Sequence, residues 1–167
     1  MFKPNNIELR DKIKKLVLLQ KNKEYVHGSH GPDNFDCAGL VWYIYSEVLG
    51  IDIYNSGYGE STTTMIMTSN YGKIVLFEDK ILDKDLSLVK EGDILFFHRQ
   101  SLKDSIPKID NKYPGHCGIY LGDNKFIHCP RTKGKVVVNN FLKSDYWMKK
   151  LVASKDIVSD EKIYIKK

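Results

Sequence analysis

The sequence predicts an α+β fold in which helices pack against an antiparallel β-sheet. The prediction rests on the order of the elements, because segments with helical spacing occupy the first third of the chain and most β-rich runs follow them. Two of these runs are joined by a tight Gly-Asp-Asn turn, as in an antiparallel hairpin. A length of 167 residues suits one domain with its own core, so we expect residues 1–167 to form a single domain.

Composition and charge narrow the class of protein. The net charge of +5 is dispersed and includes no dense Arg-rich tract, which argues against a nucleic-acid partner. The three cysteines are widely spaced and form no CxxC pair, which argues against a disulfide framework and against a zinc ribbon. We expect no metal and no cofactor, and we expect the chain to act as a monomer.

The first residues show no secretory signal, and no apolar run in the chain approaches the length of a membrane span. We therefore expect the protein to be made in the cytoplasm. Action outside the cell would then need lysis, as for a phage or mobile-element protein, or another route of delivery, unless the chain has been trimmed of a signal.

The first predicted element is an amphipathic helix over about residues 6–20. Its apolar residues recur at helical spacing from Leu9 to Val17. Asn5, followed three residues later by Glu8, resembles a capping box at the start of such a helix.

The second predicted helix begins at or near Cys37. An apolar run with helical spacing follows this cysteine, Asp36 or Asn34 can cap its start, and Gly50 can end it. Free N–H groups and the helix dipole lower the pKa of a thiol in the first turn and favour an adjacent anion. Cys37 is thus a candidate nucleophile, although a small, buried structural cysteine remains the alternative at this stage.

The middle of the chain predicts a loop, a short helix and a strand or loop over residues 51–59, 61–72 and 73–77. A turn at residues 89–93 precedes a strand at 94–98. The polar segment from Arg99 to Gly115 contains two prolines and is predicted to be a long loop, which in a compact domain is often functional.

The last third of the chain is rich in β-strand patterns. Strands are predicted at residues 116–121 and 125–129, joined by the turn at 122–124, and again at 135–139 and 150–153. Because successive side chains of a strand alternate between faces, the hairpin is expected to present His116 and His128 on one face. Cys117 and Cys129 then point to the other side and are expected to be core thiols.

These residues make one chemical hypothesis possible. A thiol nucleophile needs a base within hydrogen-bonding reach and a third group that orients the base. Cys37, His116 and His128 supply these three functions if the helix packs against the hairpin.

Three ordered blocks resemble the NlpC/p60 family of papain-like cysteine peptidases, which cut peptidoglycan stem peptides. The blocks are FDCAGLV at residues 35–41, EGDILFF at 91–97, and GHCGIYLG at 115–122, continuing to the Phe-Ile-His that ends at His128. The resemblance spans roughly residues 23–155. It implies a papain-like fold, with the nucleophile helix packed on an antiparallel sheet, and a peptidoglycan stem peptide as partner.

The resemblance also implies a role for each matching residue. Cys37 would be the nucleophile, with its backbone N–H in the oxyanion hole, His116 the general base and His128 the third polar residue. Tyr25 would line the substrate cleft, and Asp36 would support substrate binding or the start of the helix. Amide hydrolysis would proceed through a thioester, most often after γ-D-Glu in this family.

The chain departs from the family pattern at three places. Ala38 stands where the pattern has Ser, which removes a hydroxyl from the substrate-binding side. Val26-His27-Gly28 replaces an aromatic-Gly-Gly run, and the loop from Arg99 to Gly115 is longer than usual and can form a lid or a wall of the groove.

Three alternatives remain open from the sequence. The same scaffold can carry an N-acetylmuramoyl-L-alanine amidase or an acyl transferase. A zinc protein would use His27, His30 and His98 with cysteines, although nothing completes a recognised ligand spacing. A non-catalytic wall-binding or phage-structural module would need no reactive cysteine.

Overall fold

The computed structural model describes residues 6–54, 63, 66–67, 69–77, 84–98 and 115–160. Within them, an antiparallel sheet has the strand order β1-β6-β2-β3-β4-β5. The strands are β1 (Lys73–Leu76), β2 (Ile94–Phe97), β3 (His116–Gly122), β4 (Lys125–His128), β5 (Val137–Asn140) and β6 (Leu151–Asp156). The α+β prediction is therefore confirmed.

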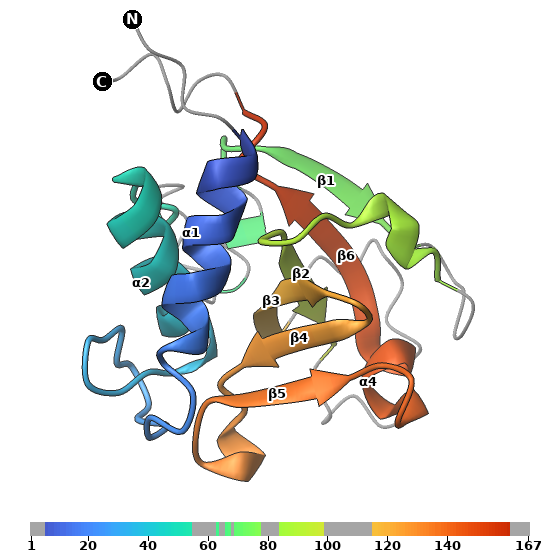
Figure 1. The fold of residues 1–167 in the computed structure, drawn as a ribbon. Helices are drawn as coiled ribbons and strands as arrows, with labels where there is room; N and C mark the ends of the chain where they lie inside the picture. The colour runs from blue at the N-terminus through green and yellow to red at the C-terminus, as the bar shows by residue number, and fades with distance from the viewer. Residues whose placement is uncertain are drawn as a thin grey trace, which may run out of the picture.

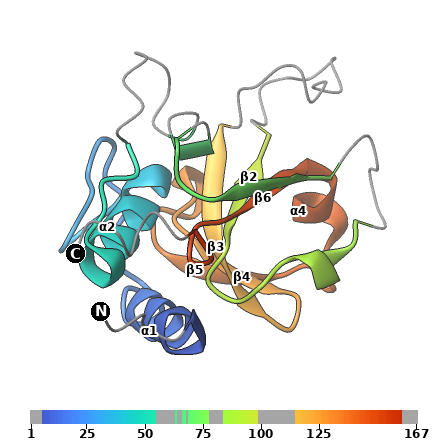
Figure 2. The ribbon, with the colours of Figure 1, turned by 90° about the horizontal axis from the view of Figure 1, so that it is seen from above.

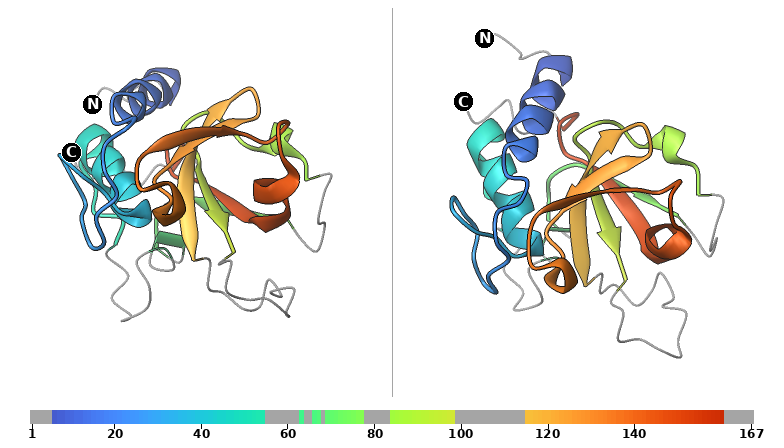
Figure 3. Two further views of the ribbon diagram at one scale, coloured as in Figure 1. Left: turned by 90° about the horizontal axis from the view of Figure 1, so that it is seen from below. Right: turned by 60° about the horizontal axis from the view of Figure 1, so that its bottom comes forward.

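Helices lie on both sides of this sheet. Helices α1 (Asn6–Leu18) and α2 (Cys37–Leu49) lie together on one side, and the short helix α4 (Asp145–Lys150) lies on the other (Figures 1, 2 and 3). Two 3-10 turns, η1 (Leu86–Leu88) and η2 (Arg131–Lys133), complete the described elements. No helix in the described ranges is long and apolar enough to cross a membrane.

Each face of the sheet has its own hydrophobic core. The core under α1 and α2 contains buried residues of both helices and of β2, β3 and β4, among them Ile13, Ile44, Phe96, Cys117 and Ile119. The core on the opposite face is rich in aromatic rings, among them Phe97, Phe126 and Phe141, with Trp147 of α4 packed against it. Burial on both faces explains why β2 is a continuous apolar run rather than an alternating one.

The ends of α2 follow the local signals in the sequence. The Asp36 side chain accepts a hydrogen bond from the Gly39 N–H at 2.6 Å, and Asp36 rather than Asn34 is the N-cap. Gly50 ends the helix in the left-handed conformation, with φ of 65°. Both predicted helices are confirmed, although α1 ends at Leu18 and the Asn5 of the proposed capping box lies outside the described residues.

Three other predictions have different outcomes. Residues 73–76, predicted as strand or loop, form the edge strand β1. Of the short helix predicted over 61–72, residues 63, 66 and 67 are helical and several others lie outside the described residues, as do residues 99–114 of the predicted long loop. Helix α4 was not predicted, because six residues are too few for a periodic apolar pattern.

Candidate active site

Cys37 is the first residue of α2 and its side chain is half-buried. The loop before it is held by Asp36, whose second carboxylate oxygen accepts the N–H of Gly28 at 3.0 Å. Gly39 lets this loop pass close to the helix, since a Cβ there would lie 2.1 Å from the Ser29 carbonyl oxygen. The N–H of Cys37 itself has no acceptor within the described part of the chain, so it can donate to an anion beside the sulfur.

The surroundings of Cys37 favour a thiolate. The adjacent Cys117 thiol is the largest influence that lowers the pKa of Cys37, and burial opposes it. His116 lowers the pKa further through a hydrogen bond and its charge, and so does the Thr63 hydroxyl, whose oxygen lies 3.9 Å from the sulfur. The net result is a Cys37 pKa well below that of an ordinary thiol.

Cys117 and Cys129 are both fully buried free thiols, as predicted. Burial raises the pKa of each of them, to about 12 for Cys129. Cys117 is not remote from the site, however, because its sulfur lies 3.6 Å from the carbonyl oxygen of Cys37. The alternation of side chains along the strand correctly assigned Cys117 to the core side of the hairpin. It did not indicate that the first turn of α2 packs against that side.

His116 and His128 lie on one face of the β3–β4 hairpin, and His116 Nε2 is 2.7 Å from His128 Nδ1. Gly118 is paired with His128 across the two strands. A Cβ at position 118 would lie 2.9 Å from the His128 Cβ, so glycine leaves the space in which the two rings meet. The predicted placement of both histidines on one face of the hairpin is confirmed.

Two further side chains, neither of them predicted from the sequence, hold this pair of histidines in place. Asn139 of β5 has its Oδ1 2.6 Å from His128 Nε2. The centroid of the Trp147 ring lies 5.3 Å from that of the His116 ring and 4.7 Å from that of the His128 ring, and the Trp147 and His128 rings are perpendicular. Residues 137–140 read Val-Val-Asn-Asn and show no apolar–polar alternation, so only the register with β4 shows that Asn139 lies on the face of His128.

The predicted substrate-binding residues differ in accessibility. Tyr25 is half-buried, and its pKa is raised mainly by burial and then by the negative charges of Cys37 and Asp36. Asp36 has its oxygens engaged at the start of the helix. Ala38 has no exposed surface, so it lies in the core and does not line the surface beside Cys37.

The histidines of the zinc alternative do not form a site in the described structure. His30 packs on the ring of Trp42, with 4.8 Å between the centroids. The buried Nδ1 of His98 has no hydrogen-bond partner among the described residues, and burial lowers the pKa of His98 to about 4. Among the described residues, no three His, Cys, Asp or Glu side chains lie close enough together to hold a metal ion.

This arrangement joins a low-pKa thiol at a helix N-terminus to a pair of histidines. The model of the NlpC/P60 family matches residues 22–156, which is most of the chain. The chain belongs to the NlpC/P60 family. The match includes Tyr25, Cys37, both histidines and Asn139.

Relatives of this NlpC/P60 chain include hydrolases from two bacteria. It is 29% identical to "Probable endopeptidase YafL" of Escherichia coli K12, over 86% of this chain and 48% of that protein. It is 27% identical to "Murein DD-endopeptidase MepH" of the same strain, over 86% of this chain and 44% of that protein. It is also 27% identical to "Gamma-DL-glutamyl hydrolase" of Bacillus subtilis, over 82% of this chain and 27% of that protein. The chain thus spans half or less of the length of these relatives.

Solved structures agree on the NlpC/p60 fold. The chain matches NlpC2 of Trichomonas vaginalis with a TM-score of 0.61 and 24% identity, over 93% of this chain and 47% of that one. It matches the NlpC/p60 domain of the peptidoglycan hydrolase SagA with a TM-score of 0.58 and 22% identity, over 88% of this chain and 97% of that domain.

Proposed function

We propose that this protein is a cysteine endopeptidase that hydrolyses an amide bond in peptidoglycan stem peptides. One observation carries the proposal: the half-buried Cys37 thiol at the start of α2 has a lowered pKa and adjoins the His116–His128 pair. A thiolate beside an imidazole and a free backbone N–H is suited to acyl transfer. The relatives named as murein endopeptidase and γ-glutamyl hydrolase support a wall peptide as the substrate.

The first half of the reaction forms a thioester. His116 Nε2 faces His128, so its Nδ1 is the nitrogen left for the thiol of Cys37. His116 takes the thiol proton and the sulfur attacks the carbonyl carbon of the amide. The backbone N–H of Cys37 stabilises the oxyanion. As the C–N bond breaks, His116 gives its proton to the leaving amine.

The second half of the reaction regenerates the thiol. His116 removes a proton from water, and the resulting hydroxide attacks the thioester carbon. The C–S bond breaks, the sulfur recovers a proton from His116, and a carboxylic acid is released. His128 stays neutral throughout, because burial and the neighbouring His116 charge hold its pKa well below the usual value.

The scissile bond is proposed to follow γ-D-Glu, as the sequence resemblance implies and as the name of the Bacillus relative supports. The name of MepH indicates a different bond in another relative, so the position of cleavage needs a direct measurement. An amidase or an acyl transferase on this scaffold would use the same thiol and would differ in its product.

Digestion of purified peptidoglycan by wild type and by Cys37→Ala tests the proposal, with the soluble products identified by mass spectrometry. Wild type should release split stem peptides whose masses identify the bond, and Cys37→Ala should release none. Products that retain whole stem peptides freed from the glycan would establish an amidase instead. Equal behaviour of the two proteins would contradict a nucleophilic role for Cys37.

A further inference from the structure

Asn139 lies at the outer end of a chain of hydrogen bonds that leads to the candidate nucleophile. In the register of β4 and β5, His128 is opposite Val137, so Asn139 lies on the same face as the His128 ring. Its Oδ1 is 2.6 Å from His128 Nε2, and His128 Nδ1 is 2.7 Å from His116 Nε2. Two short contacts therefore connect Asn139 to the imidazole beside Cys37.

The position of each hydrogen follows from the amide oxygen. An amide oxygen only accepts, so His128 Nε2 must carry the hydrogen that it receives. A neutral His128 then has a lone pair on Nδ1, which accepts the Nε2–H of His116. His116 in turn keeps the lone pair on Nδ1 that the thiol of Cys37 requires.

The opposite direction of the hydrogen bond between Asn139 and His128 would leave His116 unable to act as a base. If the Asn139 amide nitrogen donated instead, His128 would carry its hydrogen on Nδ1 and donate it to His116 Nε2. A neutral His116 would then have its own hydrogen on Nδ1, facing the thiol. One amide thus decides whether His116 has a free lone pair where proton transfer needs it.

The surroundings make this hydrogen bond decisive for His128. The His128 ring is fully buried, and no described side chain other than His116 and Asn139 makes a hydrogen bond to it. Water therefore has no exposed nitrogen through which to fix the tautomer. The rings of Phe126 and Trp147, at 4.6 and 4.7 Å, contact His128 without offering it an acceptor.

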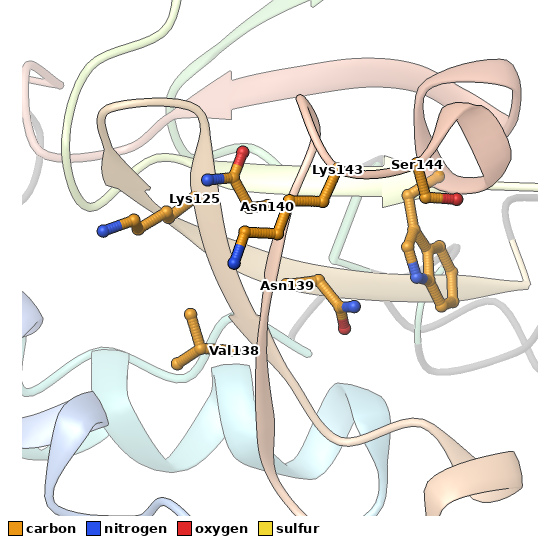
Figure 4. A pocket seen from close by; sticks show the side chains of 7 residues that line it. Lys125, Val138, Asn139, Asn140, Lys143 and Ser144 are labelled. Carbon is orange, nitrogen blue, oxygen red and sulfur yellow. The ribbon is translucent and has the colours of Figure 1, made fainter.

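Asn139 itself is accessible from outside. It lines a surface pocket of about 240 Å³ together with Lys125 and Lys143, and Figure 4 shows these side chains around the edge strand that carries it. The residue is half-buried rather than part of a packed core. Its substitution can therefore alter the hydrogen-bond chain while the two hydrophobic cores stay intact.

We propose that Asn139 is a positioning residue that fixes the tautomers of His128 and His116 so that His116 Nδ1 faces Cys37 as a base. The assignment of a base rests on the proposed function, whereas the assignment of the tautomers does not. Asn139 touches no reacting atom and acts only through the two rings.

The Asn139→Asp variant distinguishes the two possible directions of the hydrogen bond between residue 139 and His128. A carboxylate can only accept, so Asn139→Asp preserves the proposed arrangement and forbids the opposite one. Asn139→Leu keeps the approximate volume and removes the hydrogen bond. Asn140→Leu, the adjacent asparagine whose oxygen accepts the Leu142 N–H at 2.8 Å, is the matched control.

The first readout is the set of imidazole ¹⁵N chemical shifts of the intact protein, measured at the alkaline plateau of a pH titration, where the shifts no longer change with pH. Wild type and Asn139→Asp should show hydrogen on Nε2 of both rings, and Asn139→Leu should show a mixture of tautomers. The Asn140→Leu control should match wild type. Hydrogen on Nδ1 of His128 in the wild type would overturn the proposal, whether or not the protein cleaves peptidoglycan.

The second readout is the kinetics of stem-peptide cleavage. Asn139→Leu should lower kcat about tenfold and leave KM within about twofold, which is the loss expected for one side-chain hydrogen bond. Asn139→Asp should restore kcat to within about threefold, and Asn140→Leu should have no effect. If Asn139→Leu fails to fold, the Asp variant still decides, because a carboxylate at position 139 can only accept and a loss of activity would contradict the proposed direction of the hydrogen bond. A wild type without any activity would refute the proposed function alone and leave the tautomer result standing.

Discussion

Replacement of Cys117 by valine should raise the pKa of Cys37. Cys117 is fully buried on the side of β3 that faces the helices, and its sulfur lies 4.0 Å from the Thr63 hydroxyl and 3.6 Å from the Cys37 carbonyl oxygen. Its thiol makes the largest contribution that lowers the pKa of Cys37. Valine is apolar and close in size, so the substitution removes the S–H donor and little else.

The expected shift is about one pKa unit. A hydrogen bond to a charged group contributes about 1.5–3 kcal/mol, and a thiol is a weak donor, so the lower end of this range applies. One pKa unit corresponds to about 1.4 kcal/mol. The expected sign is upward, because the Cys117 thiol lowers the pKa of Cys37 and its replacement removes this influence.

The assay is the rate of Cys37 alkylation by iodoacetamide as a function of pH, followed by mass spectrometry of the Cys37 peptide. Only the thiolate reacts, so the rate rises with pH through the pKa of Cys37 and then levels. Wild type should reach half its maximal rate well below the pH of an ordinary thiol, and Cys117→Val about one unit higher. Cys129→Val is the control, because Cys129 donates to the Phe35 carbonyl oxygen at 3.4 Å rather than to any atom of Cys37. An unchanged profile in Cys117→Val, or an equal shift in the control, would refute the reasoning.

Three further substitutions test interactions that stabilise the fold and the site. In the structure the Arg10 guanidinium lies 2.7 Å from the buried Asp93 carboxylate. Arg10→Met leaves this carboxylate without its partner, so it should lower the free energy of unfolding by about 3–5 kcal/mol in urea titrations. Gly118→Ala should lower kcat at least tenfold, because the new Cβ, 2.9 Å from the His128 Cβ, displaces that ring; wild-type kinetics would contradict this. Lys155 donates to three backbone carbonyls, and burial lowers its pKa to about 8 from an unfolded value of 10.5. The free-energy cost of burying the charged Lys155 ammonium is complete below pH 8 and disappears toward pH 10.5. As the pH rises through that range, the wild type should therefore gain stability relative to Lys155→Met in paired thermal melts.

The parts of the site that depend on local signals were predictable from the sequence. Asp36 and Gly50 mark the two ends of α2, so the position of Cys37 in its first turn follows from cap chemistry. Alternation along one hairpin placed His116 and His128 on the same face. Both inferences need only residues that are close together in the chain.

The missed parts depend on packing between distant segments. Asn139 faces His128 only because β5 pairs with β4 in one particular register. Trp147 belongs to a helix of six residues, too short for periodicity to indicate it. The proximity of Cys117 to Cys37 depends on how α2 packs on β3, and these residues lie 80 positions apart.

The candidate site lies at the end of β3 that carries His116 and Cys117, whose side chains point to opposite faces of the sheet. Adjacent residues of β3 serve opposite faces, since Cys117 contacts Cys37 in the core under the helices and His116 packs on Trp147 in the aromatic core. The thiol and the imidazole are therefore held by two separate hydrophobic cores joined by a single strand. A packing defect in either core would move one partner and leave the other in place, and proton transfer tolerates displacements of only a fraction of an ångström. This coupling explains why residues that touch no substrate, such as Gly118 and Asn139, are expected to affect kcat more than KM.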